Sequence, residues 1–381
     1  MSAQRIGIGY RRQLIGCVLI YVMGRGGSRH EHGRMRILLI CRTAASHSGA
    51  TVLVLLLALL LAACGAPQAP PAAATAPEPA DEPLRLAGPG AVVSFPLMRM
   101  AEVGVTVDGR VLPAEFRLWQ SADQLRVMLA RGEVDYSATP ANLPALMANR
   151  GEPVRLLNVS VWGLLWLVSR DPQVHDFGDL RGRTLLTPFR RDMGAIALHE
   201  LYAAQGLEPG RDLQLRQARD ALDAVALMLA GQADHAVLPE PTASLLLQRN
   251  RNEGGAPLYR VQSLEAAWAL RFPQQPELPQ AGVMAAAPRA TDTALAQAIV
   301  TAYAGASRWC KDDPPACAAL ARRHLPHMPL PALEESIRVT RLDGLPTAQV
   351  RPQLEALYRL ILASQPEAVG GRLPDPAFYG P

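Results

Sequence analysis

Short apolar runs alternate with longer amphipathic segments through most of the chain after residue 83. Runs of about four to eight aliphatic residues are typical of buried strands, and segments of roughly 10–15 residues with apolar positions three and four apart are typical of helices. This alternation predicts an α/β protein with parallel sheets, and the pattern from Thr291 onward is mainly helical. The predicted strands lie at residues 84–88, 115–119, 134–138, 154–161, 164–169, 184–188, 212–217 and 234–239.

One strand and helix unit occurs twice. Residues 128–140 (MLARGEVDYSATP) and 228–239 (MLAGQADHAVLP) each contain a helix end, a glycine, an aspartate, a short strand and a proline, with the aspartate and the proline equally spaced. Glycine ends a helix readily because it adopts positive φ angles, and proline fits the first turn of the next helix. The repeat predicts two similar α/β lobes.

A leader pattern precedes this region. A short basic stretch begins at Met35, and residues 50–63 are apolar except for one threonine. An apolar run of this length suits the central part of a signal peptide and is shorter than the roughly 20 residues that span a bilayer as a helix. The sequence LAAC at residues 61–64 resembles the bacterial lipobox. We therefore expect residues 35–63 to be a lipoprotein signal peptide and Cys64 to carry a lipid.

Two further N-terminal segments are not expected to join the fold. Residues 1–34 hold a second, weaker apolar patch, and we interpret them as an over-extended start, with Met35 as the true first residue. Residues 65–83 contain seven alanines and six prolines. Such a composition favours a disordered, semi-extended spacer over a core. The lipidated cysteine and this Ala/Pro-rich linker, residues 64–83, are expected to tether a folded domain to a membrane.

Charge and cysteine usage exclude some classes of protein. The segment expected to be removed holds eight arginines and one glutamate, so the formal net charge changes from +4 for the whole chain to about −3 for the remainder. That balance provides no basic face for nucleic acid. Beyond Cys64 only Cys310 and Cys317 remain. In an oxidising compartment they are expected to form a structural disulfide, although two free thiols on neighbouring helix ends would also fit.

Several segments together resemble the nitrate/sulfonate/taurine and thiamine-precursor group of periplasmic binding proteins. They are GDLRGRTLLTP at 178–188, AAQGLEPG at 203–210, DALDAVALMLAGQADHAVLPEP at 220–241, the first-lobe segment at 129–157 and the late helical pair at 294–326. The resemblance covers about residues 84–363, and the order and spacing of the segments are more specific than any one of them.

The resemblance implies a type II periplasmic binding protein fold in two lobes. Lobe one is expected at residues 84–168 plus 282–381, and lobe two at residues 171–265. Two crossing strands, near 164–169 and 280–286, are expected to act as the hinge that closes around a ligand. The implied function is capture of a small molecule for an ABC importer, with a permease and its ATPase as partners.

The resemblance also implies a ligand site between the lobes, where strand ends and helix N-termini meet. Two arginines beside a helix N-terminus suit an anion such as a carboxylate, sulfonate or phosphate, although a solvated basic loop capped by Asp192 fits equally well. The candidate ligand-binding residues are Gly90, Ser94, Phe95, Thr139, Asn142, Trp162, Thr187, Arg190, Arg191, Asp192 and Glu240.

Other candidates have simpler explanations as well. The glycines at residues 88 and 90 could simply form a turn, and Thr139 and Asn142 could simply cap a helix. Glu240 could hold an amine or ring nitrogen of the ligand, or brace Arg190 across the loop. Trp162 is the tryptophan favoured for stacking on a ligand.

The sequence offers no motif for catalysis. His199 and Glu200 lack the second histidine of the HExxH motif, and a proline separates His324 from His327. We therefore predict no catalytic residue, cofactor or metal site, and expect a monomer in the periplasmic or extracytoplasmic space. Two alternatives stay open: an enzyme of the same fold, as in menaquinone or pyrimidine biosynthesis, and the ligand-sensing lobe of a membrane signalling system.

Overall fold

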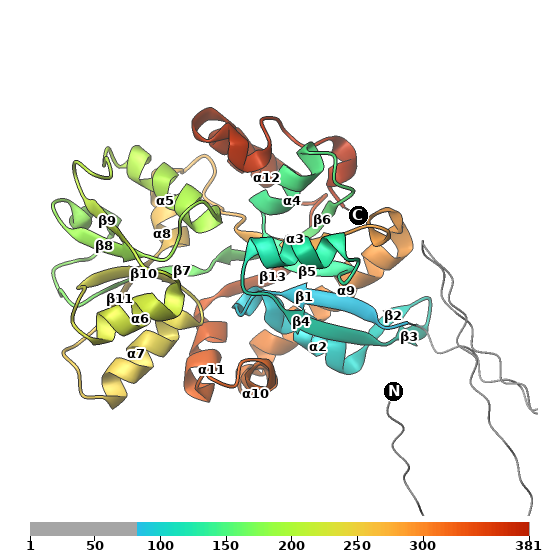
Figure 1. Cartoon of the computed structure of the whole chain (residues 1–381), viewed down its shortest axis with the longest axis horizontal. Helices are drawn as coiled ribbons and strands as arrows, with labels where there is room; N and C mark the ends of the chain where they lie inside the picture. The colour runs from blue at the N-terminus through green and yellow to red at the C-terminus, as the bar shows by residue number, and fades with distance from the viewer. Residues whose placement is uncertain (1–81, 381) are drawn as a thin grey trace, which may run out of the picture. The chain divides into compact units, whose positions relative to one another are not determined.

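The computed structural model describes residues 82–380, and the predicted signal peptide, Cys64 and most of the linker lie outside these residues. The strands form two large sheets and one hairpin (Figure 1). The hairpin joins β2 (Val105–Val107) to β3 (Arg110–Leu112). The first sheet has the order β13-β6-β12-β5-β1-β4 and contains β1 (Leu84–Gly88), β4 (Ala114–Leu118), β5 (Tyr136–Pro140), β6 (Arg155–Gly163), β12 (Ala281–Ala285) and β13 (Arg341–Pro346).

The second sheet has five strands in the order β11-β7-β10-β8-β9. Its members are β7 (Leu165–Ser169), β8 (Thr184–Thr187), β9 (Gln214–Gln217), β10 (His235–Pro239) and β11 (Tyr259–Ser263). We call the part built on the six-stranded sheet lobe one and the part built on the five-stranded sheet lobe two. The change of sheet falls at Leu164, because β7 pairs with β10 and β11. This point precedes the predicted end of the first segment of lobe one at residue 168.

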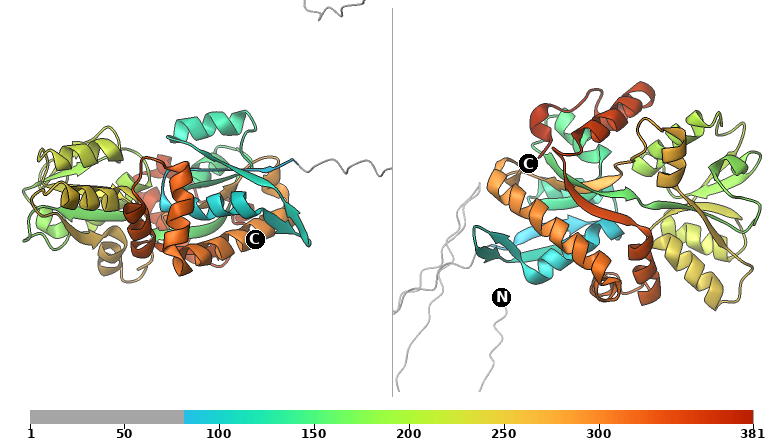
Figure 2. Two further views of the ribbon diagram at one scale, coloured as in Figure 1. Left: turned by 90° about the horizontal axis from the view of Figure 1, so that it is seen from below. Right: turned by 180° about the vertical axis from the view of Figure 1, so that it is seen from behind.

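Helices pack on both faces of each sheet, and Figure 2 shows α3 and α9 on opposite sides of the six-stranded sheet. The helices of lobe one are α2 (Phe95–Val103), α3 (Ala122–Ala130), α4 (Asn142–Asn149), α9 (Thr293–Asp312), α10 (Pro314–His324), α11 (Leu330–Val339) and α12 (Arg351–Ser364). Those of lobe two are α5 (Met193–Ala204), α6 (Ala221–Leu229), α7 (Thr242–Asn252) and α8 (Leu264–Arg271). Short 3-10 helices complete the fold at η1 (Val92–Ser94), η2 (Phe177–Leu180), η3 (Arg289–Thr291), η4 (Pro366–Val369) and η5 (Pro376–Phe378).

The two-lobed α/β class predicted from the sequence is confirmed, with one correction. Both sheets are mixed, although β1, β4 and β5 run parallel to one another, as do β8, β9 and β10. The prediction of parallel sheets was wrong for the strands next to the points where the chain crosses from one lobe to the other. β12 is antiparallel to β5 and β6, and β7 is antiparallel to β10 and β11. The reason is that these strands enter a sheet directly from the other lobe, without a crossover helix.

Strand register decides which ends of the two sheets face each other. β6 ends at Gly163 and β7 begins at Leu165, so Leu164 is the first crossing. The carboxyl end of β10 lies at this point, because Pro239 pairs with Leu165. The carboxyl end of β5 lies there as well, because Ala281 of β12 pairs with both β5 and β6 at their last residues or close to them. The helices that follow β5 and β10 therefore begin beside the crossing.

Large hydrophobic clusters fill both lobes. One packs α2, α9, α10 and α11 against the six-stranded sheet, and its fully buried members include Phe95 and Tyr303. A second spans the crossing and combines Trp162 and Tyr358 of lobe one with Trp268 of lobe two. Cys310 and Cys317 form a disulfide at the junction of α9 and α10, with Cα atoms 5.0 Å apart. Within residues 82–380, no helix combines the length and apolar character needed to cross a membrane.

Candidate functional site

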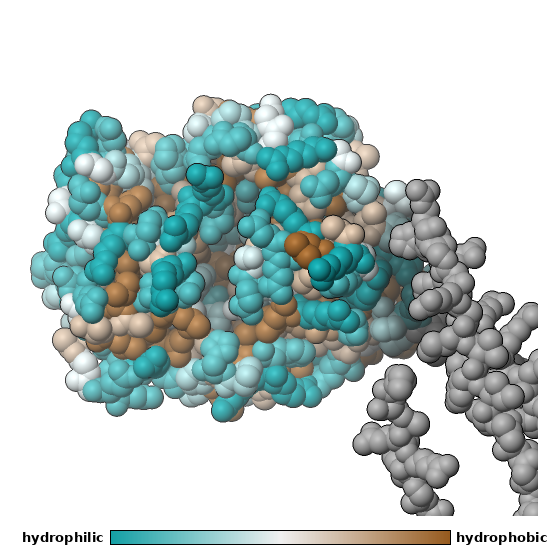
Figure 3. Space-filling model, in the orientation of Figure 1, coloured by the Kyte–Doolittle hydropathy of each residue, from teal (hydrophilic) through white to brown (hydrophobic). Residues whose placement is uncertain are grey.

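The candidate site lies between the lobes, where the carboxyl ends of strands from both sheets meet. Figure 3 shows the surface hollowed between the two lobes. η1 and α4 follow β1 and β5 on the side of lobe one, and α5 and α7 follow β8 and β10 on the side of lobe two. Because a helix N-terminus carries unpaired N–H groups and a partial positive charge, this arrangement suits a negatively charged ligand.

Lobe one contributes buried polar atoms that lack a protein partner. Ser94 is fully buried at the end of η1, and its Oγ has no hydrogen-bond partner among the described residues. Gly88 allows this position, since a Cβ at residue 88 would lie 2.3 Å from Ser94 Oγ. Asn142 is 6% exposed and donates through Nδ2 to the carbonyl of Ala368 at 3.2 Å, while its Oδ1 is also unpartnered within the described part of the chain. Thr139 is buried, with one long contact of 3.4 Å to the carbonyl of Pro140.

The loop between β8 and α5 supplies the facing surface of lobe two. Thr187, which is 2% exposed, accepts a hydrogen bond from the N–H of Phe189 at 3.2 Å. Asp192 caps α5 by accepting from the N–H of Ala195 at 3.1 Å. The ring of Phe189 lies against Gly194, where an added Cβ would come within 2.7 Å of ring atoms. The local sequence therefore fixes a short, rigid turn at the N-terminus of α5.

Arg190 and Arg191 are exposed in this turn. Arg190 donates to the carbonyl of Ala218 at 3.4 Å. Neither arginine forms an ion pair with any carboxylate of the described residues. The neighbouring Asp192 is exposed by surface area, yet desolvation by the surrounding protein raises its pKa, against the opposing effect of the N–H groups of Ala195 and Gly194. A side chain that is exposed and still desolvated is expected in a concave surface.

Glu240 is used within the protein. It is fully buried, forms an ion pair with Arg260 and accepts a hydrogen bond from the N–H of Ser244 at 3.2 Å. Arg260 also donates to Ser244 Oγ at 2.8 Å and lies over the ring of Trp166 at 4.8 Å. Burial raises the pKa of Glu240, and the charge of Arg260 opposes this rise. The brace to Arg190 was one of two roles considered for Glu240, and in the structure Arg260 takes that place.

Three further candidates have surroundings that differ from those of the polar residues described above. Phe95 is fully buried in the core that α2 and α9 share. Trp162 is also fully buried, and the guanidinium of Arg341 covers its ring at 4.8 Å. Gly90 is exposed, and a side-chain atom of Leu325 lies 3.2 Å from the position of an added Cβ. The structure thus places the two aromatic candidates, Phe95 and Trp162, in the core.

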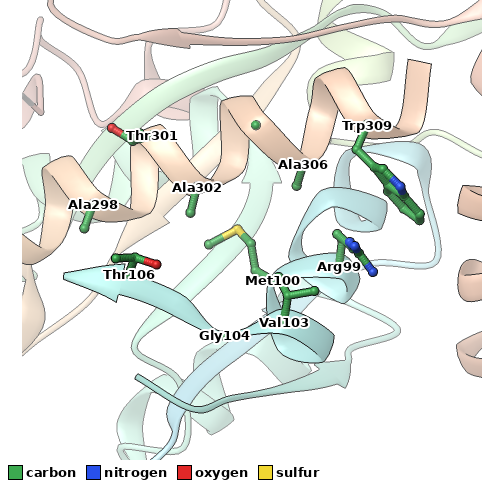
Figure 4. A pocket seen from close by; sticks show the side chains of 11 residues that line it. Arg99, Met100, Val103, Gly104, Thr106, Ala298, Thr301, Ala302, Ala306 and Trp309 are labelled. Carbon is green, nitrogen blue, oxygen red and sulfur yellow. The ribbon is translucent and has the colours of Figure 1, made fainter. Parts of the chain in front are cut away.

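A separate hollow of about 420 Å³ lies on lobe one between α2, β2 and α9 (Figure 4). Its walls are mostly small or apolar, and Arg99 is its one charged lining residue in the described part of the chain. Arg99 lies 4.4 Å from the centre of the Trp309 ring and pairs with Glu102 at 2.7 Å. Because this charge is already neutralised, the hollow lacks the free cations of the interlobe site.

The histidines singled out in the sequence have structural partners. His199 Nδ1 lies 3.3 Å from Glu200, and Glu200 also accepts a hydrogen bond from Ser364. His324 packs edge-on against Phe116 with ring centres 5.3 Å apart. Within residues 82–380, no group of three histidine, cysteine, aspartate or glutamate side chains is arranged to hold a metal ion.

Sequence reasoning missed Arg260 at the centre of this region, and it placed Gln280 at the start of the second hinge strand without foreseeing its side-chain contact. Arg260 neutralises Glu240, and Gln280 contacts the first crossing through its side chain. Neither stands in a motif, since Arg260 is one of many arginines and Gln280 ends a loop rich in glutamine and proline. Phe189 lies between the candidate residues Thr187 and Arg190, and the nearby Gly194 is the signal for its position.

The chain has the two-lobed fold that solved structures of periplasmic solute-binding proteins share. An ABC transporter structure from Parabacteroides distasonis is 21% identical, covers 79% of this chain and 99% of that chain, and has a TM-score of 0.66. The nitrate-binding protein NrtA from Synechocystis PCC 6803 is 15% identical, with coverages of 74% and 83% and a TM-score of 0.55. The aliphatic sulphonate binding protein SsuA from Escherichia coli is 17% identical, with coverages of 78% and 93% and a TM-score of 0.53. At these identities the likeness shows the fold alone, and no family model or curated protein matches the sequence.

Proposed function

We propose that this chain is the extracytoplasmic solute-binding component of an ABC importer and captures a small anionic ligand between its lobes. One observation carries the anionic preference: Arg190 and Arg191 are exposed at the N-terminus of α5 without a carboxylate partner among the described residues. The helix dipole favours negative charge at the same point, so the two effects add. The solved structures with this fold include proteins named for nitrate and for aliphatic sulphonates.

The buried polar atoms of lobe one support the same proposal. Ser94 Oγ and Asn142 Oδ1 are enclosed without a partner among the described residues. An unpaired buried polar atom costs roughly 1–3 kcal/mol, so a ligand that supplies the missing hydrogen bonds would recover part of that energy. A small anion with an added donor group, such as an aminosulfonate, matches the cations of lobe two and the acceptor of lobe one.

Capture is proposed to occur by closure of the lobes about the two crossings. Lobe two and lobe one are joined at Leu164 and through the segment that leads from α8 to β12. Hinge closure brings both halves of a divided site onto one ligand. The radius of gyration measured by small-angle scattering should therefore fall when the ligand saturates the protein, and an unchanged radius would remove this mechanism.

We propose further that Cys64 anchors the protein in a membrane through a lipid and that the linker holds the domain within reach of a permease. The apolar run at residues 50–63 and the LAAC sequence support this proposal. The variant Cys64→Ser should accumulate as unprocessed precursor and take up no labelled palmitate. Normal maturation of that variant would contradict the anchor and leave the proposed ligand site unaffected.

The ligand proposal is tested by a thermal-shift screen of nitrate, methanesulfonate, taurine and small carboxylates, followed by titration calorimetry. A ligand at about 100 times its Kd should add roughly 2.7 kcal/mol of stability. Arg190→Ala or Arg191→Ala should weaken binding about tenfold or more, because a charge-assisted hydrogen bond contributes roughly 1.5–3 kcal/mol. The matched control is Arg251→Ala. Arg251 is exposed in the last turn of α7, at the end away from the candidate site. If both arginine variants bind as tightly as the parent, the ligand is not held as an anion by α5.

A further inference from the structure

Gln280 connects the two chain crossings. It is 5% exposed and lies immediately before β12, at the end of the second crossing. Its N–H donates to the carbonyl of Val161 at 3.0 Å, and its carbonyl accepts from the N–H of Ala141 at 2.9 Å. Its side-chain Oε1 accepts a hydrogen bond from the N–H of Leu164 at 2.7 Å. One residue therefore contacts β6, the start of α4 and the first crossing.

Leu164 depends on this side chain because it lies between the two sheets. β6 ends at Gly163 and β7 begins at Leu165, so the N–H of Leu164 pairs with Gln280 and not with a neighbouring strand. The carbonyl of Leu164 accepts from the N–H of Glu240 at 2.9 Å, and Glu240 is held in lobe two by Arg260. A continuous series of hydrogen bonds thus runs from the first turn of α4 in lobe one to the start of α7 in lobe two.

Closure of the lobes makes a particular demand on this contact. Hinge residues change φ and ψ when two domains rotate, so the N–H of Leu164 changes direction. A buried N–H that loses its acceptor is costly. A carbonyl fixed in a strand ladder cannot follow that rotation, whereas an amide on a side chain with several rotatable bonds can. Gln280 therefore allows Leu164 to rotate without losing its hydrogen bond.

We propose that Gln280 is a positioning residue for ligand capture. Its side chain keeps Leu164 paired while the lobes move, and its backbone holds Ala141, which precedes the candidate ligand residue Asn142. This inference rests on the proposed function, because a hinge of this kind matters only if the lobes close on a ligand. Gln280 itself need not touch the ligand.

The test compares three variants of the full chain. Gln280→Met keeps the length of the side chain and removes the acceptor, and Gln280→Glu keeps an acceptor oxygen. Gln232→Met, at an exposed turn between α6 and β10, is the control. Hydrogen exchange of the Leu164 amide and calorimetric titration with nitrate and methanesulfonate are measured for each. Gln280→Met should raise exchange at Leu164 about tenfold and weaken binding by a similar factor, as expected for one lost buried hydrogen bond, and Gln280→Glu should restore most of both.

The outcomes separate this inference from the proposed function. If the parent binds a probe and Gln280→Met binds equally well, the positioning role is overturned, whatever the exchange rate. If the parent binds neither probe, the proposed function fails for these anions. Exchange at Leu164 then tests the hinge contact that the inference requires: a rise that Gln280→Glu reverses supports this contact, and no rise overturns the inference. Should Gln280→Met fail to fold, Gln280→Asn, which withdraws the oxygen from Leu164, carries the same expectation.

Discussion

The repeated unit is held differently in the two lobes. In lobe one, β5 begins beside Asp135, which is 1% exposed, pairs with Arg85 at 2.7 Å and accepts from the backbone of Arg85 at 2.9 Å. In lobe two the matching Asp234 is exposed, and the next residue, His235, is buried and hydrogen-bonded to Ser169 at 2.9 Å. The same sequence pattern thus places two strands alike, while one is anchored by a buried aspartate in an ion pair and the other by a buried histidine.

The two units also differ at their carboxyl ends, where β5 leads into α4 and β10 leads into α7. After β5, Asn142 has an acceptor atom without a partner among the described residues. After β10, Glu240 is consumed by Arg260 and Ser244. The comparison teaches that the backbone pattern decides where a polar group stands at the interlobe site, and that its neighbours decide whether the group is available to a ligand. Substitutions at the two ends should therefore affect different properties.

The largest effect is expected for Glu240→Ala. This change leaves the guanidinium of Arg260 buried without its carboxylate, and removal of one partner from a buried ion pair typically costs about 3–5 kcal/mol. Chemical denaturation should show a loss of unfolding free energy in this range. The variant Glu240→Gln keeps a hydrogen-bond acceptor and should retain part of this unfolding free energy. A loss below about 1 kcal/mol for the alanine variant would show that Glu240 is not a structural anchor of lobe two.

A smaller effect separates the two aspartates of the repeat. Asp135→Asn removes the charge that Arg85 contacts, and we expect a loss of about 2 kcal/mol, since Arg85 is partly exposed and solvent screens the pair. The matched change Asp234→Asn should cost less than about 0.5 kcal/mol, as is usual for exposed positions. Equal losses in the two variants, measured by the same denaturation experiment, would mean that the lobes are anchored alike.

Much of the fold follows from the sequence, because strand and helix periods are local properties. The expected strands at residues 84–88, 164–169 and 234–239 coincide with β1, β7 and β10 to within one residue. The β2–β3 hairpin was missed although its signal was present. Asp108 and Gly109 have φ angles of 49° and 81°, the Asp-Gly pair that tight hairpin turns favour. Antiparallel pairing of β12 was not predictable from local pattern, because it depends on the chain returning from the other lobe.

The candidate site could be predicted only in part. Thr139, Asn142 and Thr187 were chosen as candidates because each lies where a predicted strand ends and a helix begins. Parallel strands place such ends at one edge of a sheet. The partner of Glu240 could not be found in this way. Arg260 lies on a different strand, and only the pairing of β11 with β7 brings it over Trp166 and beside Glu240.

Asn142→Ala should separate binding from stability. The change removes one hydrogen bond to Ala368, so the unfolding free energy should fall by only about 1 kcal/mol. Affinity for the ligand found in the screen should fall about tenfold, because the unpartnered Oδ1 is the proposed acceptor. Calorimetric titration and thermal denaturation of the same variant measure both. Unchanged affinity would indicate that Asn142 serves only to hold the segment around Ala368.

The smallest expected effect is on stability at low pH. It distinguishes His235 from Asp135 by the pH range in which each group takes up a proton. Burial lowers the pKa of His235 below its ordinary value of about 6.5, and the nearby Arg183 lowers it further, against Asp234 and Asp171. At Asp135 burial raises the pKa, but the hydrogen bonds from Arg85 prevail, so it falls below its ordinary value of about 4. In both cases the unfolded chain binds a proton at a higher pH than the folded protein does.

Stability should therefore decline in two steps as the pH falls, the first from about 6.5 through His235 and the second from about 4 through Asp135. His324 of lobe one, whose pKa burial also lowers, contributes to the first step. Two variants show which histidine causes the first step. His235→Gln should flatten the decline in hydrogen exchange protection of β10. His324→Gln should flatten the decline in protection of β4, on which His324 packs. Asp135→Asn should leave the first step intact and remove part of the second. If His235→Gln leaves protection of β10 as dependent on pH between 5 and 6.5 as in the parent, the hydrogen bond between His235 and Ser169 is not what anchors lobe two.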